Sequence, residues 1–217
     1  MRAGRGMGDG SSPFDYAIAI TSDHLVQYSR EMIAKTAIEN EFDYLAMIDD
    51  DMIGPPDLWD KLLALDVDIV APLAFTRKRP HYPVVYAQRG GWRKDSPYHP
   101  IETHIVRNYP RNQLFECDAV GFGAVLIKVD VLKRMPYPRF FTMFGTDGTG
   151  EDIWFCLQAK RLVKARVFCD ARVQLLHLGE RTYIGEKEYL EQNPEVKTLY
   201  EVAGEWSKAK SQEDLIA

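Results

Sequence analysis

The stretch that decides the fold is YLAMIDDDM, residues 44–52, in which a short apolar run leads directly into three aspartates. A run of this length predicts a buried strand over residues 44–48. In open α/β sheets, ligands bind beyond the carboxyl ends of the strands. Three adjacent carboxylates repel one another, so their position at a strand end favours a bound cation. The alternative is an acidic surface turn, although such turns usually carry Gly or Asn between the acids.

The segments around residues 44–52 alternate between strand and helix patterns. Residues 15–21 and 68–74 are short apolar runs that predict buried strands, and residues 25–39 repeat apolar side chains with helical spacing. Residues 57–65 predict a short helix after two prolines. This alternation predicts an α/β fold with parallel strands. Further along the chain we expect loops and short strands over 77–110, strands over 114–117, 122–128, 166–170 and 173–178, and a helix over 151–162.

The bulk composition describes one globular unit. The chain has 217 residues, of which 46% are hydrophobic, enough to bury one core. We expect a flexible arm over residues 1–13, a main domain over 14–180 and a peripheral helical tail over 181–217. The formal net charge of −5 excludes a general electrostatic attraction to nucleic acid or anionic membranes, though a local basic patch could still form. The oligomeric state stays open.

The cysteines and the N-terminus bear on location. Cys117, Cys156 and Cys169 are odd in number and widely spaced, which is not a disulfide or zinc pattern. They are expected to be buried thiols in a reducing compartment. We find no apolar run near the roughly 18 residues needed to span a bilayer and no apolar region of a signal peptide. A cytoplasmic protein without a transmembrane segment is therefore expected.

The acidic triplet is the first candidate site. If the segment is extended, Asp49 and Asp51 point the same way, with Asp50 between them. One carboxylate can then contact Mg²⁺ or Mn²⁺, and the other a ribose or a metal-bound water. Asp66 and Asp68 have the same spacing but precede their strand, so they predict a solvated helix-to-strand turn at the opposite end of the sheet.

A second acidic site is expected at GTDGTGED, residues 145–152, where three glycines lead to an acidic pair at a helix start. Asp152 is a candidate general base for an acceptor hydroxyl, with Glu151 beside it and Asp147 as a weaker candidate. The glycines suit a mobile lid. Simple capping of the helix by Glu151 and Asp152 is the alternative, because the helix dipole favours acids at this end.

Other candidates are scattered along the chain. His177 ends a strand and is a candidate metal ligand, although a lone histidine in that place is more often structural. Arg77 follows a strand in a basic cluster and is a candidate for diphosphate contact, or else a solvated surface residue. Arg30, in the first helix, is similarly ambiguous. Gly121 and Gly123 are candidates for close substrate approach, or for a bulge or tight turn.

Taken in order, these motifs resemble the family-2-like GT-A glycosyltransferases. The resemblance covers roughly residues 15–179 and rests on YLAMIDDDM, PPDLWDKLLALDVDIVAPLAFTRKRP, DAVGFGAVLIKVDVLKRM, GTGEDIWFC and VQLLHLG. It implies a GT-A-like, Rossmann-type mixed sheet flanked by helices. It also implies transfer of a sugar from a UDP- or GDP-sugar donor to a glycan or other hydroxyl acceptor, with dependence on Mn²⁺ or Mg²⁺ and inversion at the anomeric carbon as further expectations.

The resemblance assigns roles residue by residue. Asp49 and Asp51 match the DxD motif, with Asp51 as the metal ligand and Asp49 near it. Asp152 matches the catalytic base of inverting members, and Glu151 then supports the base or orients the acceptor. His177 matches the late metal-binding histidine of related families.

This sequence departs from the family in one respect: only one strand and one helix precede Asp49, so the fold is expected to be abbreviated at the N-terminus. Two other functions stay open. One is a non-catalytic GT-A module that binds a nucleotide or sugar, and the other is a DxD phosphatase, which would need a later acidic loop that GEDIWF does not match. Nucleotidyl transfer is a weaker third, because the glycine-rich N-terminus lacks a preceding strand.

Overall fold

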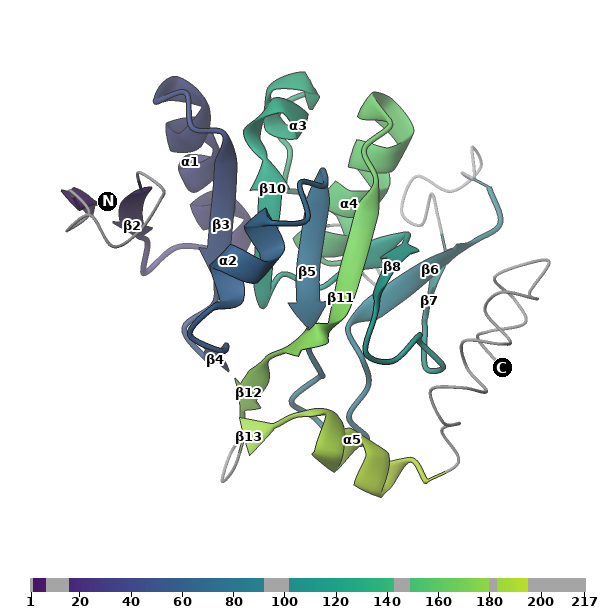
Figure 1. Cartoon of the computed structure of the whole chain (residues 1–217). Helices are drawn as coiled ribbons and strands as arrows, with labels where there is room; N and C mark the ends of the chain where they lie inside the picture. The colour runs from purple at the N-terminus through teal and green to yellow at the C-terminus, as the bar shows by residue number, and fades with distance from the viewer. Residues whose placement is uncertain (1, 7–15, 92–101, 143–148, 180–182, 195–217) are drawn as a thin grey trace.

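The computed structural model describes residues 2–6, 16–91, 102–142, 149–179 and 183–194. At its centre is a five-stranded sheet with the order β3-β10-β5-β11-β8 (Figure 1). β5 and β11 are parallel, β10 is antiparallel to both of its neighbours β3 and β5, and β8 is antiparallel to β11. The strands are β3 (Tyr44–Ile48), β5 (Ile69–Leu73), β8 (Leu114–Cys117), β10 (Ala124–Lys128) and β11 (Val167–Gln174).

The sheet is mixed, so the expectation of parallel strands from element alternation alone is corrected. The mixed sheet implied by the family resemblance is confirmed. The three strands β3, β5 and β11 share one direction, and each of β5 and β11 is preceded by a helix, as a parallel crossover requires. β10 instead follows directly from the short strand β9 (Ala119–Val120), enters from the other end and therefore runs the opposite way.

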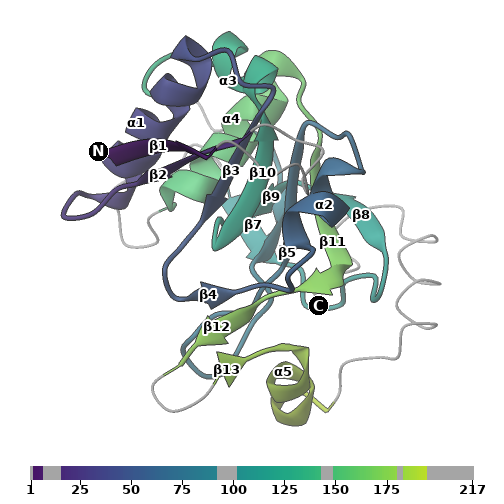
Figure 2. The same cartoon turned by 60° about the vertical axis from the view of Figure 1, so that its left-hand side comes forward.

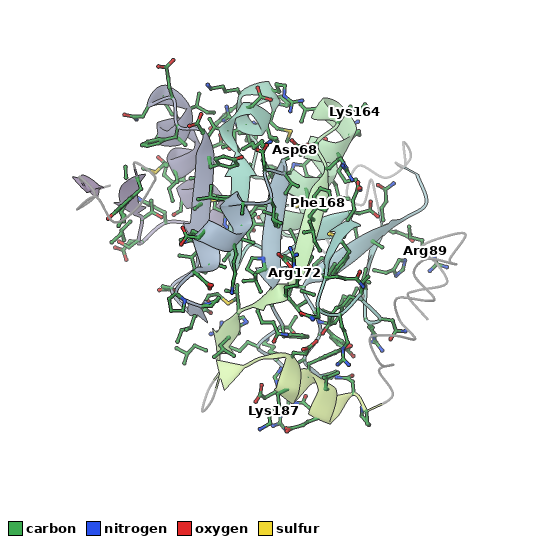
Figure 3. The ribbon with its side chains drawn as sticks, viewed as in Figure 1. Asp68, Arg89, Lys164, Phe168, Arg172 and Lys187 are labelled. Atoms are coloured by element: carbon green, nitrogen blue, oxygen red, sulfur yellow. The ribbon has the colours of Figure 1, made fainter. Side chains whose placement is uncertain are left out.

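Side chains alternate between two cores, one on each face of the sheet. Val125 and Ile127 of β10 join one apolar cluster, whereas Ala124 and Leu126 join the other. The first cluster includes side chains from α1 (Val26–Glu39), α3 (Val129–Arg134) and α4 (Glu151–Val163). The second includes α2 (Leu58–Leu63) and Phe168 of β11 (Figures 2 and 3). The expected helices thus cover both faces.

Two small sheets lie beside the main one. One has the order β13-β12-β4, from β4 (Met52–Ile53), β12 (Leu176–Leu178) and β13 (Tyr183–Ile184). The other has the order β7-β6-β9, from β6 (Val85–Arg89) and β7 (Glu102–Ile105) with β9. β4 and β12 continue from β3 and β11 at one end of the main sheet (Figure 1), so they bring the segments after these strands together.

The N-terminal segment differs from the expectation. β2 (Tyr16–Ile20) is a strand, but it pairs antiparallel with β1 (Arg2–Gly6), and Ile18 and Ile20 are exposed. The prediction of a buried strand over 15–21 is therefore wrong, because an apolar run does not state which neighbour a strand pairs with. Residues 2–6 form a strand within the segment expected to be a flexible arm; residues 7–15 lie outside the described part.

The last helix of the described part is α5 (Glu186–Gln192). Tyr189 is fully buried, its ring stacks on Phe75 with centroids 4.9 Å apart, and its hydroxyl donates to the carbonyl of Arg107 at 2.9 Å. One aromatic side chain therefore ties this helix to the core, and the domain bounds expected from the sequence stay a prediction. Within the described part of the chain, no helix is long and apolar enough to span a bilayer.

Candidate functional site

The three aspartates form a turn between β3 and β4. The amide of Asp49 donates to the carbonyl of Gly123 at 2.9 Å, and the amide of Met52 donates back to the carbonyl of Asp49 at 3.2 Å. The segment is therefore not extended, and Asp49 and Asp51 send their carboxylates to different partners. Asp50 between them is exposed. The triplet lies at a strand end, as predicted, but it divides into two separate contacts.

The first contact joins Asp51 to His177. The pairing of β4 with β12 places His177 opposite Met52, and Nε2 of His177 lies 3.1 Å from Oδ2 of Asp51. Nδ1 of His177 lies 2.9 Å from the carbonyl of Phe75. A carbonyl can only accept, so Nδ1 carries the proton, and a neutral ring then presents its Nε2 lone pair to the carboxylate. Two acceptors that face each other are stabilised by a proton or a metal cation between them.

Arg77 completes this group. Its Nη1 lies 3.4 Å from Oδ2 of Asp51, and more than half of its side chain is exposed. Because the guanidinium is partly solvated, the ion pair contributes little to stability and leaves donors free for another anion. The structure thus brings Asp51, His177 and Arg77 together, three residues that the sequence singled out separately.

The second contact joins Asp49 to Arg30 of α1. Nη2 of Arg30 donates to both carboxylate oxygens of Asp49 at 3.2 Å and to the carbonyl of Phe122 at 3.1 Å, while Nη1 donates to Glu151. Arg30 is 5% exposed, which is too little for contact with a large ligand. Burial raises the pKa of both Asp49 and Glu151, and the charge of Arg30 opposes that rise in each.

Asp152 lies in the first turn of α4. Its Oδ1 accepts from the amide of Ile153 at 2.7 Å, and its Oδ2 lies 3.4 Å from the amide of Phe122. The first bond satisfies a free amide of the helix start, so Asp152 does contribute to capping. The second aims the carboxylate toward the turn before β10. Burial, with the charge of Asp152, raises the pKa of Tyr86 to about 12, which places this phenol in the same neighbourhood.

Gly121 and Gly123 allow close packing around these carboxylates. A Cβ at Gly121 would lie 3.0 Å from Val84 and 3.6 Å from Oδ2 of Asp152, and one at Gly123 would collide with the end of the Met52 side chain. The amide of Gly121 already donates to the carbonyl of Val84 at 2.8 Å. Close packing against Val84 and Met52 is thus a structural reason for both glycines, and their contact with substrate stays a prediction.

The described residues do not form a complete metal-binding cluster. Among the residues that the structure describes, no group of three or more His, Cys, Asp or Glu side chains is placed to hold a metal ion. Asp51 and His177 supply two oxygen and nitrogen donors of the kind that Mn²⁺ accepts. The second-sphere bond from Nδ1 to a carbonyl is the usual arrangement for a ligating histidine. These two donors would leave the remaining ligands of a cation to water or to a bound ligand.

Other sequence interpretations concern residues that lie away from this site. Asp66 has a positive φ of 49° in the turn between α2 and β5, where its exposed carboxylate pairs with Lys128. Asp68, labelled in Figure 3, lies at the end of the sheet away from β4 and β12, so the predicted helix-to-strand turn is confirmed. The three cysteines are free and buried, and burial raises the pKa of Cys156 to about 12. Gly145 and Asp147 lie outside the described residues.

Comparisons with known proteins bear on the fold of the chain and not on the chemistry of the site. No protein-family profile and no curated protein sequence matches this chain. The crystal structure of A197 from STIV superimposes with a TM-score of 0.52 at 19% sequence identity, over 79% of this chain and 77% of A197. The two proteins share a fold. The chain has a GT-A-like mixed α/β fold with helices on both faces of the sheet, as its sequence predicts.

Three residues of the site were not singled out from the sequence. Phe75 orients His177 through its carbonyl, Phe122 contacts Arg30 through its carbonyl and ring, and Tyr86 lies near Asp152. Phe122 stands between two candidate glycines, so its position carried a signal. Phe75 acts through its backbone carbonyl, and Tyr86 acts through its place in the fold. Neither feature leaves a motif in the sequence.

Proposed function

We propose that this protein is a divalent-metal-dependent GT-A glycosyltransferase that transfers a sugar from a UDP- or GDP-sugar to the hydroxyl of a glycan or other acceptor. The observation that carries the proposal is the contact between Asp51 and His177 at 3.1 Å. Two segments 126 residues apart meet there at a strand end, with the tautomer of His177 set by Phe75. Asp49, in the turn after β3, and Asp152, at the start of α4, lie near each other and provide separate carboxylates for donor and acceptor.

In this proposal Asp51 and His177 hold Mn²⁺ or Mg²⁺. Asp49, two residues before Asp51, contacts the ribose or a metal-bound water. The cation, when bound, offsets charge on the leaving diphosphate. Arg77 already pairs with Asp51 through an exposed side chain, so it can turn its remaining donors to the same diphosphate. Asp50 is exposed beside them and is available to the donor.

The proposed base is Asp152. Its Oδ2 accepts weakly from the amide of Phe122 at 3.4 Å, so this oxygen keeps lone pairs free for the proton of an acceptor hydroxyl. Removal of that proton makes the oxygen a better nucleophile toward the anomeric carbon. A base on the acceptor side and a leaving diphosphate on the opposite side give displacement with inversion. Glu151 is bound to Arg30, so it supports the base rather than the acceptor.

The deciding experiment is a panel of nucleotide sugars incubated with the purified protein and candidate glycan acceptors, with Mn²⁺, Mg²⁺ or a chelator. The proposal predicts sugar transfer or slow donor hydrolysis that needs a metal and disappears in Asp51→Ala. Nucleotide binding without either reaction would indicate a non-catalytic module. Phosphate release from simple phosphoesters, without turnover of any nucleotide sugar, would indicate a phosphatase. A cytoplasmic location, proposed from the three reduced cysteines, is checked by fractionating the native source.

A further inference from the structure

Arg30 holds two of the candidate carboxylates together from inside the protein. Its guanidinium donates to Glu151 at the start of α4, to both oxygens of Asp49 at the end of β3, and to the carbonyl of Phe122 before β10. The same guanidinium lies 5.3 Å from the centre of the Phe122 ring. A single side chain of α1 thus connects three further segments that all border the site.

The network reaches Asp152 through one residue. Phe122 accepts from Arg30 with its carbonyl, and its amide lies 3.4 Å from Oδ2 of Asp152. Glu151, the residue next to Asp152, is bound directly to Arg30. The position of the proposed base relative to Asp49 is therefore set from two directions by the same guanidinium. No other cationic side chain bonded to both Asp49 and Glu151 occurs among the interactions of the described residues.

The chemistry of the contact requires a cation. Glu151 is 8% exposed and Asp49 is about half-buried, and the guanidinium of Arg30 is bonded to both carboxylates. A buried carboxylate beside a half-buried one is stabilised by a positive charge that lies between them. A guanidinium suits this place because its planar fork presents several donors in fixed directions, which a lysine ammonium cannot match.

We propose that Arg30 is a positioning residue that serves as the permanent cation of the Asp49–Glu151 pair and fixes the distance between donor and acceptor carboxylates. This inference rests on the proposed function for its effect on turnover. It makes Arg30 part of the internal frame of the site rather than a substrate contact. It also implies that removing the guanidinium leaves two facing carboxylates and a carbonyl, a set of hard oxygen ligands that a divalent cation can occupy.

The test compares Arg30→Met with Arg139→Met. Arg139 forms a similarly buried ion pair with Glu31, the next residue of α1, but no bond from it to the candidate site occurs among the described interactions. Thermal unfolding is measured for each variant with and without Mn²⁺ or Mg²⁺, in the absence of nucleotide. Both variants should melt at a lower temperature than the wild type. Only Arg30→Met should recover several degrees on adding the metal ion alone.

The kinetic arm separates positioning from stability. Arg30→Met should lose kcat for sugar transfer by about a hundredfold, because a small displacement of reacting groups has effects of that size, with a smaller change in the donor KM. Arg139→Met should keep both constants within about twofold below its melting temperature. If Arg30→Met does not fold, Arg30→Lys keeps the charge but not the fork, and it should show the same kcat loss with a donor KM near that of the wild type.

The outcomes are distinct for the two levels of the proposal. No gain in metal response for Arg30→Met over the wild type and Arg139→Met, or wild-type kcat in Arg30→Lys, would overturn the role of Arg30. A wild-type protein that turns over no nucleotide sugar would overturn the proposed function alone, because the metal response of Arg30→Met without nucleotide does not depend on it.

Discussion

Replacing Asp51 with Asn tests the centre of the proposed metal site, and the contacts of this residue predict an unusual result. Nδ1 of His177 lies 2.9 Å from the carbonyl of Phe75 and Nε2 lies 3.1 Å from Oδ2 of Asp51, so with a neutral ring two acceptors face each other there. In Asp51→Asn the amide nitrogen can take that position and donate to Nε2. The substitution removes a proposed metal ligand while it provides a hydrogen bond for the metal-free protein.

The expected magnitudes nearly balance. A new neutral hydrogen bond contributes about 1 kcal/mol to the free energy of unfolding. Loss of the Arg77–Asp51 ion pair costs about 0.5 kcal/mol, because the Arg77 side chain is 56% exposed and its charge is screened by solvent. At roughly 2–4 °C per kcal/mol for a protein of this size, the metal-free variant should melt within about 2 °C of the wild type, and not below it.

Ligand-induced stabilisation should behave in the opposite way. Nucleoside diphosphate with Mn²⁺ at a hundred times its dissociation constant should stabilise the wild type by about 2.7 kcal/mol. That corresponds to a rise of roughly 5–10 °C, and Asp51→Asn should lose most of it. The assay is thermal unfolding at pH 8 with UDP or GDP, each with Mn²⁺ or with a chelator.

Asp66→Asn is the matched control. Asp66 has the same DxD spacing, but its exposed carboxylate pairs with Lys128 in the turn between α2 and β5. This variant should keep the full metal-dependent rise. The reasoning about His177 is refuted if metal-free Asp51→Asn melts more than about 3 °C below the wild type, since that result means that the contact between Asp51 and His177 stabilises the metal-free protein. A metal-dependent rise that survives in Asp51→Asn would place the metal elsewhere.

Three further predictions address the other groups of the site. Asp152→Asn should bind donor nearly normally and lose transfer by about a hundredfold or more, whereas Glu151→Gln should lose less; a product that keeps the donor's anomeric configuration would contradict the role of Asp152 as base. Binding of nucleotide with Mn²⁺, measured by calorimetry, should weaken in His177→Ala because the ring supplies one of the two proposed metal ligands; unchanged binding would make His177 a structural residue. Between pH 10 and 12 the free energy of unfolding of the wild type should fall by up to about 3 kcal/mol more than that of Tyr86→Phe. The reason is that the pKa of Tyr86 is about 12 in the folded state and near 10 in the unfolded state, so alkali favours unfolding of the wild type. Urea unfolding measures the difference, and equal losses in the two proteins would show that Tyr86 ionises normally.

Local patterns predicted most of the elements. The helical spacing of residues 25–39 and 151–162 corresponds to α1 and α4, and the apolar run of residues 68–74 corresponds to β5. The two helices have strong apolar periodicity, and β5 is fully buried. Each of these features leaves a clear pattern in the sequence. The run of residues 15–21 has the same apolar character, yet β2 is exposed and pairs with β1. Apolar composition predicts a strand, but the choice of partner is a tertiary property.

The same limit applies to the site. Each of Asp49, Asp51, Arg30, Arg77 and His177 was a candidate by residue type and place in the chain. Their pairing was not predictable, because Arg30 meets Glu151 across 121 residues and His177 meets the carbonyl of Phe75 across 102. No spacing rule spans such separations, and a backbone carbonyl leaves no residue-specific signal.

The turn at Asp49–Asp51 explains why one acidic triplet can carry two kinds of contact. In an extended strand the first and third carboxylates would point to one side and share a cation. Here the bond from the amide of Met52 to the carbonyl of Asp49 closes the segment into a turn. Asp49 then faces inward to the buried Arg30, and Asp51 faces His177 and the exposed Arg77. Repulsion within the triplet is thus offset by an internal cation at one end, which leaves the other end as the place where an external cation adds most stability.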